Sequence, residues 1–104
     1  MKPRIQSFVE VPIWHVDRAS RDLIVRSLED PGFDGVTAHE GLDRTAFVYA
    51  HDEWPDGWPT PLTDLFVWAR NLGCDWIRFE IEGLSVDGLP VFTDFGDDED
   101  RWFT

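Results

Sequence analysis

The chain has 104 residues, with 21 acidic and nine basic side chains and a formal net charge of −12. This length suits one domain, and the 42% of hydrophobic residues, six Trp and eight Phe among them, excludes a disordered chain. Such a charge disfavours direct binding to nucleic acid or to an anionic membrane and favours a basic protein surface. The alternative is that the charge serves only solubility.

The charge is unevenly distributed along the chain. Residues 1–28 carry five basic and three acidic side chains, whereas the remainder carries four basic and 18 acidic ones. No segment contains the roughly 20 apolar residues that a membrane-spanning helix needs, and the N-terminus lacks the apolar run of a signal peptide. We therefore expect a cytoplasmic protein. The single cysteine, Cys74, excludes an internal disulfide.

The first two expected elements are a strand and a helix. Residues 5–14 alternate in the manner of a strand, and Pro12, which has no N–H to donate, places that strand at a sheet edge or at a bulge. Residues 17–30 are expected to form a helix, with Asp17 as its N-cap. The helix should stop at the Pro-Gly pair of residues 31–32.

The middle of the chain predicts two strands and a second helix. The strands are expected at 35–40 and 45–51, followed by a loop at 52–59 that contains two prolines and a glycine. Residues 60–72 are expected to be helical, with Thr60 as N-cap and Pro61 at the first helical position. One face of that helix is apolar, through Leu62, Leu65, Phe66, Ala69 and Leu72.

Two more strands are expected, at 75–82 and at 90–95. In the first, alternation places Ile77, Phe79 and Ile81 on one face and Arg78, Glu80 and Glu82 on the other. The sequence therefore predicts one α+β domain over 1–95, with the order β-α-β-β-α-β-β and two helices packed against one mainly antiparallel sheet. Residues 96–104 would form an acidic and aromatic tail.

Two short motifs in the C-terminal half resemble a known family. The segments 73–79 (Gly-Cys-Asp-Trp-Ile-Arg-Phe) and 86–90 (Val-Asp-Gly-Leu-Pro) are similar to those of an uncharacterised family of short bacterial proteins found on plasmids, integrative elements and prophages. The similarity extends over most of residues 13–95. It implies a mobile-element setting, and it transfers no activity and no site residue.

Catalytic and metal-binding motifs are missing from the sequence. The side chains of His15, His39, His51 and Cys74 do not stand at metal-ligand spacings, and there is no nucleophile elbow, P-loop or dinucleotide-binding motif. His51 and His39 each precede a carboxylate, but adjacent residues of a strand face opposite ways. We expect no enzyme, no cofactor and no metal, with a small enzyme that uses a histidine and a carboxylate as the weakest alternative.

Acidic and aromatic side chains are the candidate contacts with a partner. They are Glu80 and Glu82 on the expected strand and Asp97, Asp98, Glu99, Asp100 and Trp102 in the tail. We expect a non-enzymatic, anti-CRISPR-like or anti-restriction-like protein of a phage or mobile element, which binds a basic surface of a host protein, such as a nucleic-acid-binding complex, and blocks it. Alternatives are an immunity-like or accessory module that binds a basic toxin or partner, and a homodimer paired through an edge strand.

Overall fold

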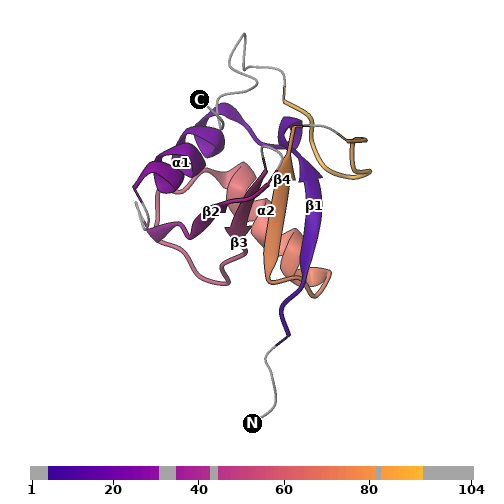
Figure 1. Ribbon diagram of the computed structural model, residues 1–104, viewed down its shortest axis with the longest axis horizontal. Coiled ribbons are helices and arrows are strands. Elements are labelled where there is room, and N and C mark those ends of the chain that lie inside the picture. Colours follow the sequence, from indigo (N-terminus) through magenta and orange to yellow (C-terminus); the bar gives the residue numbers. More distant parts are fainter. Residues whose placement is uncertain (1–4, 31–34, 43–44, 82, 93–104) are drawn as a thin grey trace.

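The computed structural model describes residues 5–30, 35–42, 45–81 and 83–92. Their elements, in chain order, are strand β1 (Phe8–Pro12), the short 3-10 helix η1 (Ile13–His15), helix α1 (Arg18–Glu29), strands β2 (Ala38–Glu40) and β3 (Ala46–Tyr49), helix α2 (Thr60–Asn71) and strand β4 (Trp76–Glu80) (Figure 1). The predicted α+β fold is confirmed.

The sheet has four strands in the order β1-β4-β3-β2. β4 is parallel to β1 and antiparallel to β3, and β2 is antiparallel to β3. Ile77 stands at the centre of the sheet, between Val9 on one side and Val48 on the other. The sheet is therefore mainly antiparallel, as predicted. β1 lies at an edge, a position that tolerates Pro12, which has no N–H to donate.

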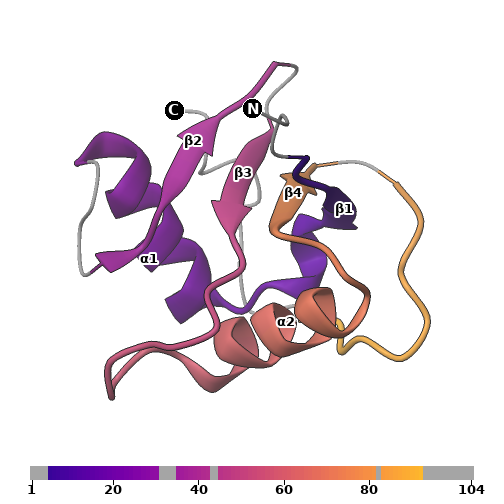
Figure 2. The ribbon, with the colours of Figure 1, turned by 90° about the horizontal axis from the view of Figure 1, so that it is seen from below.

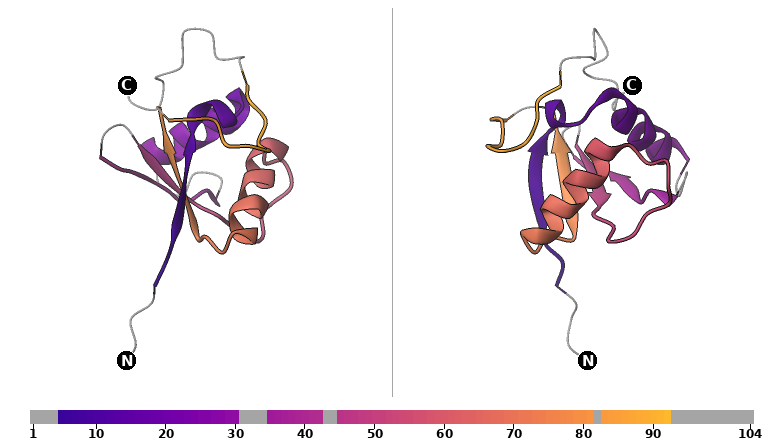
Figure 3. Two further views of the ribbon diagram at one scale, coloured as in Figure 1. Left: turned by 90° about the vertical axis from the view of Figure 1, so that its right-hand side faces the viewer. Right: turned by 180° about the vertical axis from the view of Figure 1, so that it is seen from behind.

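Both helices pack against the same face of the sheet. Figure 2 shows the strands in one layer with α1 and α2 beneath them, and Figure 3 shows the same two layers from the side and from behind. The largest buried side chains lie between these layers; they include Val11, Ile24, Leu62, Leu65, Phe66, Ile77 and Phe79. Burial of such a side chain contributes about 1.5–3 kcal/mol to folding, so this interface is the main source of stability.

The N-terminal ends of the two helices can be compared with the N-caps predicted from the sequence, Asp17 and Thr60. Asp17 caps α1 as predicted, because its Oδ1 accepts the Ser20 N–H at 3.2 Å. The prediction for Thr60 was wrong, because α2 begins at Thr60 and Pro59 occupies the cap position without a side-chain hydrogen bond. The Pro59 carbonyl accepts the N–H groups of Leu62 and Thr63 at 3.1 and 3.2 Å, so the helical bonding begins one residue earlier than expected.

The observed strands are shorter than the predicted ones. The first ends at Pro12, where η1 takes over. The last expected strand, at 90–95, is not found in its described part, because residues 90–92 are outside the sheet and 93–95 are outside the described residues. Phe92 instead donates its N–H to the Trp14 carbonyl at 2.8 Å.

Neither helix is long and apolar enough to cross a bilayer, a finding that applies to the described residues.

Candidate functional site

The second face of the sheet has no described helix over it. In Figure 1 the viewer looks onto this face, and α2 lies behind the strands. Alternation along the strands directs to it the side chains of Phe8, Glu10, His39, Phe47, Tyr49, Trp76, Arg78 and Glu80. We call this surface the open face.

Aromatic rings occupy the middle of the open face. Tyr49 and Trp76 are direct neighbours on β3 and β4, and their rings meet edge to face with centroids 5.2 Å apart. The ring of Phe8, on β1, reaches across β4 to that of Phe47 on β3, at 5.4 Å. The His39 ring lies 5.8 Å from Trp76. Phe8 is 48% exposed, so the cluster is open to solvent rather than part of the core.

A shallow hollow of about 280 Å³ lies among these rings. We call it the aromatic hollow; it is lined by Gln6, Ser7, Phe8, His39, Phe47 and Trp76. Ser7 is fixed at its rim, because its hydroxyl donates to the Gly73 carbonyl at 3.0 Å and its N–H donates to Asp75 Oδ2 at 3.2 Å. The hollow therefore combines apolar ring walls with a small polar rim.

Phe47 is held in place by the turn that follows β2. The Gly41 N–H donates to the Thr45 carbonyl at 2.9 Å and brings the two strands together. A β-carbon at position 41 would lie 3.1 Å from the Phe47 ring and would crowd the Thr45 hydroxyl. The absence of a side chain at this glycine thus makes room for the ring.

Two arginines reach the open face, and both have acidic partners. Arg78 pairs with Glu10 at 3.0 Å and with Glu80 at 4.0 Å. Arg70, near the end of α2, donates to the Ala50 carbonyl, pairs with Asp75 at 3.5 Å and places its guanidinium carbon 5.0 Å from the centre of the Tyr49 ring. Their positive charges are therefore compensated within the molecule.

The residues predicted as partner contacts are only partly described. Glu80 lies on the open face, as strand alternation predicted, and it pairs with Arg78 there. Glu82, Asp97, Asp98, Glu99, Asp100 and Trp102 lie outside the described residues. The structure therefore adds a surface that the sequence analysis did not name.

His15 is a buried structural residue. The Val86 N–H donates to its Nε2 at 2.9 Å, and its Nδ1 lies 2.6 Å from the Pro90 carbonyl. Because Nε2 accepts, Nδ1 must carry the proton and donate. Both ring nitrogens are thus used to fix residues 83–92 against η1.

His51 stands within a ring of aromatic side chains. Its ring lies 5.0 Å from Tyr49, 5.4 Å from Trp58 and 5.9 Å from Phe66. Burial lowers the pKa of His51 below its usual 6.5, and the Arg70 charge lowers it further, against a raising effect of Asp52. The lowered pKa favours the uncharged imidazole.

Neither of two cavities formed by described residues joins a histidine to a carboxylate. The aromatic hollow contains His39 and no acidic lining residue. A second cleft, of about 420 Å³, lies between the start of α2 and residues 88–92 and is lined by Asp64 without a histidine. In the described part of the chain, no three histidine, cysteine or acidic side chains are grouped to hold a metal ion.

The sequence contained a signal for the open face that its analysis did not use. Trp76 lies two residues before Arg78 and four before Glu80, so its side chain points to the same side of β4 as theirs. The alternation had placed Arg78 and Glu80 on the polar side of that strand. Phe8 likewise shares its side with Glu10. When aromatic side chains share one side of two neighbouring strands with charged side chains, they indicate an exposed aromatic surface.

Comparison with known proteins identifies a family. No curated protein and no solved structure matches the chain. The C-terminal domain of a family of unknown function, DUF5983, matches residues 8–94, which include all the strands and helices that the structure describes. The chain therefore belongs to the DUF5983 family of unknown function.

Proposed function

We propose that this domain is a non-catalytic module that binds another protein through its open face. The observation that supports this function is the aromatic cluster on a sheet face that no described helix covers. Exposed apolar patches of this kind mark binding surfaces in small soluble proteins. Aromatic side chains are enriched at the centres of such interfaces, because they bury a large area with few rotatable bonds.

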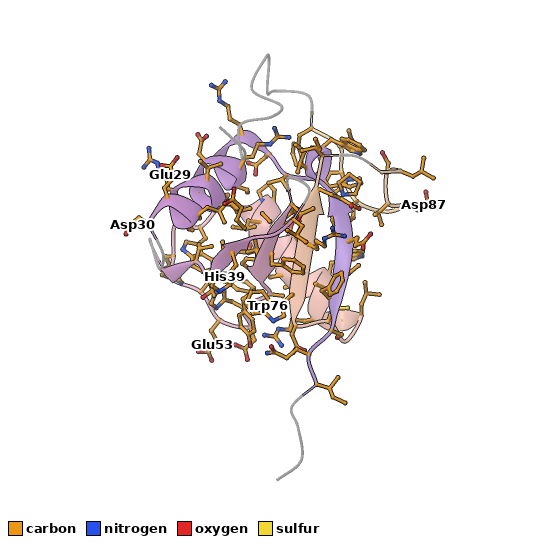
Figure 4. All side chains as sticks on the ribbon, in the orientation of Figure 1. Glu29, Asp30, His39, Glu53, Trp76 and Asp87 are labelled. Atoms are coloured by element: carbon orange, nitrogen blue, oxygen red, sulfur yellow. The ribbon has the colours of Figure 1, made fainter. Side chains whose placement is uncertain are left out.

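The partner should present a basic surface. The net charge of −12 attracts such a surface and speeds association. Figure 4 shows Trp76 and His39 toward the middle of the view, whereas Glu29, Asp30, Glu53 and Asp87 lie toward the outline of the molecule. On the open face itself, Glu10 and Glu80 pair with Arg78, so the attraction comes from the charge of the whole domain.

The more specific proposal is that the partner handles nucleic acid and is blocked by this domain. A protein that binds DNA or RNA offers a basic groove for phosphates, and an acidic domain competes for that groove. This is how an anti-CRISPR or anti-restriction protein of a phage or mobile element would act in the cytoplasm. The resemblance of segments 73–79 and 86–90 to mobile-element proteins supports this setting.

Direct binding of single-stranded nucleic acid is the competing use of an aromatic sheet face, because bases stack on exposed rings. Such sites also need free positive charge for the phosphates. On the open face, Arg78 is paired with Glu10 and Arg70 with Asp75. The charge thus favours a protein partner over a nucleic acid.

Site-specific photo-crosslinking in the cell that encodes the protein tests the open face. A photoreactive phenylalanine analogue replaces Phe8, which is 48% exposed on the open face, or Val67, which is 45% exposed on α2. We expect a discrete adduct with a second protein from position 8 and none from position 67. Equal adducts from both positions, or an adduct from position 67 alone, would contradict the proposal.

The identity of the adduct decides between the remaining possibilities. An adduct with a second copy of this chain would indicate a homodimer, and an adduct with nucleic acid would indicate base stacking. If the partner is a nucleic-acid-binding protein, fluorescence anisotropy should show that the domain displaces labelled DNA or RNA from it. Simultaneous binding of the domain and the nucleic acid would contradict blocking.

A further inference from the structure

The aromatic hollow is a candidate site for one side chain of the partner. It has a volume of about 280 Å³ and is lined by the side-chain rings of Phe8, Phe47, Trp76 and His39, so it is a concave, mostly apolar site. The rings stand at different angles: Phe8 and Phe47 are nearly perpendicular, at 81°, and His39 is tilted by 43° to Trp76. An entering group therefore meets ring faces from more than one direction.

The chemistry of these walls favours a planar cation. The face of an aromatic ring carries partial negative charge and attracts a guanidinium or ammonium group, with Trp as the strongest partner. Among the described residues, no arginine or lysine lines the hollow. Glu10 lies on the same face of β1 as Phe8, where it is paired with Arg78. A cation in the hollow would thus meet aromatic rings.

The same face already binds one guanidinium group in this way. Arg70 lies over the Tyr49 ring at 5.0 Å, and Tyr49 contacts Trp76, which lines the hollow. Arg70 also pairs with Asp75, whose other oxygen accepts the Ser7 N–H at the rim of the hollow. The aromatic hollow offers rings of the same kind to a second guanidinium group, and Asp75 is linked to its rim through Ser7.

We infer that the aromatic hollow binds an arginine side chain of the partner protein. The inference rests on the proposed protein-binding function and names the group that the open face recognises. Arginine suits the site better than lysine, because its guanidinium is planar, stacks on rings and is more weakly hydrated than an ammonium group. The negative net charge of the domain brings the basic partner to this face before the side chain enters.

Short peptides test the inference with the full-length chain. Three probes of five residues, alternating glycine with either arginine, lysine or the neutral isostere citrulline, are titrated while NMR follows the ring signals of Trp76 and Phe47. We expect saturable shifts with the arginine peptide, binding about fivefold weaker with the lysine peptide, and no saturable shift with citrulline. Equal affinity for the arginine and lysine peptides would show charge attraction alone and would overturn the inference.

Two variants separate the hollow from the general charge of the domain. Phe47→Leu keeps an apolar side chain but removes a ring wall, so the preference for arginine over lysine should disappear. Leu84→Ala, at a residue that is 91% exposed outside the sheet, should leave the preference unchanged. A preference that survives Phe47→Leu would place the arginine elsewhere and contradict the inference.

Failure of this inference is distinguishable from failure of the proposed function. If position 8 crosslinks to a partner protein but the arginine peptide shifts neither Trp76 nor Phe47, the open face is the binding surface and the arginine assignment is wrong. If an oligothymidine of the same length shifts these rings at lower concentration than the arginine peptide, the hollow binds bases and both proposals fail.

Discussion

His15 makes hydrogen bonds with Val86 and Pro90, which follow it in sequence by 71 and 75 residues. Its ring accepts one backbone bond, from Val86, and donates one, to Pro90. The ring is fully buried, whereas Val86 is half-buried and Pro90 is exposed. The residue is thus one attachment point of the segment that follows β4, beside the hydrogen bonds of Trp14 with Ser85 and Phe92.

We predict that His15→Ala destabilises the domain by about 2–3 kcal/mol, since a fully buried ring and its two hydrogen bonds to the backbone are lost. Chemical denaturation measures the free energy of unfolding, and amide hydrogen exchange at Val86 should accelerate. His39→Ala is the control, because His39 is exposed, and it should change stability by less than about 0.5 kcal/mol. Unchanged exchange at Val86 in His15→Ala would show that the bond does not hold this segment.

His51 predicts a pH dependence of stability. Its pKa is lowered in the folded protein, first by burial and then by Arg70, so the unfolded chain takes up a proton at higher pH than the folded one does. This contribution to stability is complete above the usual value of 6.5 and is lost as the pH falls through the lowered folded-state pKa.

The test is to measure the free energy of unfolding between pH 8 and about pH 5, above the usual range of Asp and Glu titration. The wild type should lose stability as the pH falls from 6.5, and His51→Gln should lose less over the same interval. The other histidines are common to both proteins, so only the difference between the two profiles reports on His51. Parallel profiles would contradict the predicted pKa.

At the scale of elements, the two helices begin in different ways. The Asp17 carboxylate satisfies the Ser20 N–H at the start of α1, whereas the Thr60 side chain makes no cap bond at the start of α2. Asp17→Ala should therefore destabilise the protein by about 1 kcal/mol, and Thr60→Ala by less than about 0.5 kcal/mol. Urea denaturation of the two variants provides the comparison. A larger loss for Thr60→Ala would contradict the assignment of the caps.

Local patterns were sufficient to predict most elements. The apolar periodicity gave both helices, and alternation gave β4 with Ile77 and Phe79 buried, because burial of one side leaves a regular mark on the sequence. The ends were less accurate. The mistaken cap at Thr60 arose because a threonine before a proline is compatible with two starting positions, and only the bonds of the Pro59 carbonyl distinguish them.

The position of the candidate site depends on contacts that local patterns do not encode. β1 pairs with β4, which lies 68 positions away in register, and this pairing brings Phe8 beside Trp76. Both helices then lie on one side of the sheet and leave these rings uncovered. A strand pattern shows that Trp76 faces away from Ile77, but it does not show which face the helices cover. The open face is thus a property of the tertiary fold.

At the scale of the whole molecule, charge and aromatic surface should govern different steps of binding. Long-range attraction acts before contact and raises the association rate, whereas side chains buried in the interface slow dissociation. The acidic residues Asp97, Asp98, Glu99 and Asp100 lie outside the described residues and remain the candidate steering group. Phe8, on the open face, is the candidate anchor.

Once crosslinking has identified the partner, its binding kinetics test this division. A variant with four substitutions, Asp97→Asn, Asp98→Asn, Glu99→Gln and Asp100→Asn, should associate about tenfold more slowly at low salt. The effect should be much smaller at 0.5 M salt, because salt screens the attraction.

Phe8→Ala should instead raise the dissociation rate by about tenfold at both salt concentrations, which corresponds to a lost interface anchor of about 1.4 kcal/mol. Surface plasmon resonance separates the two rates. If neutralising residues 97–100 leaves association unchanged, those carboxylates do not steer the partner; if Phe8→Ala leaves dissociation unchanged, the anchor lies outside the open face.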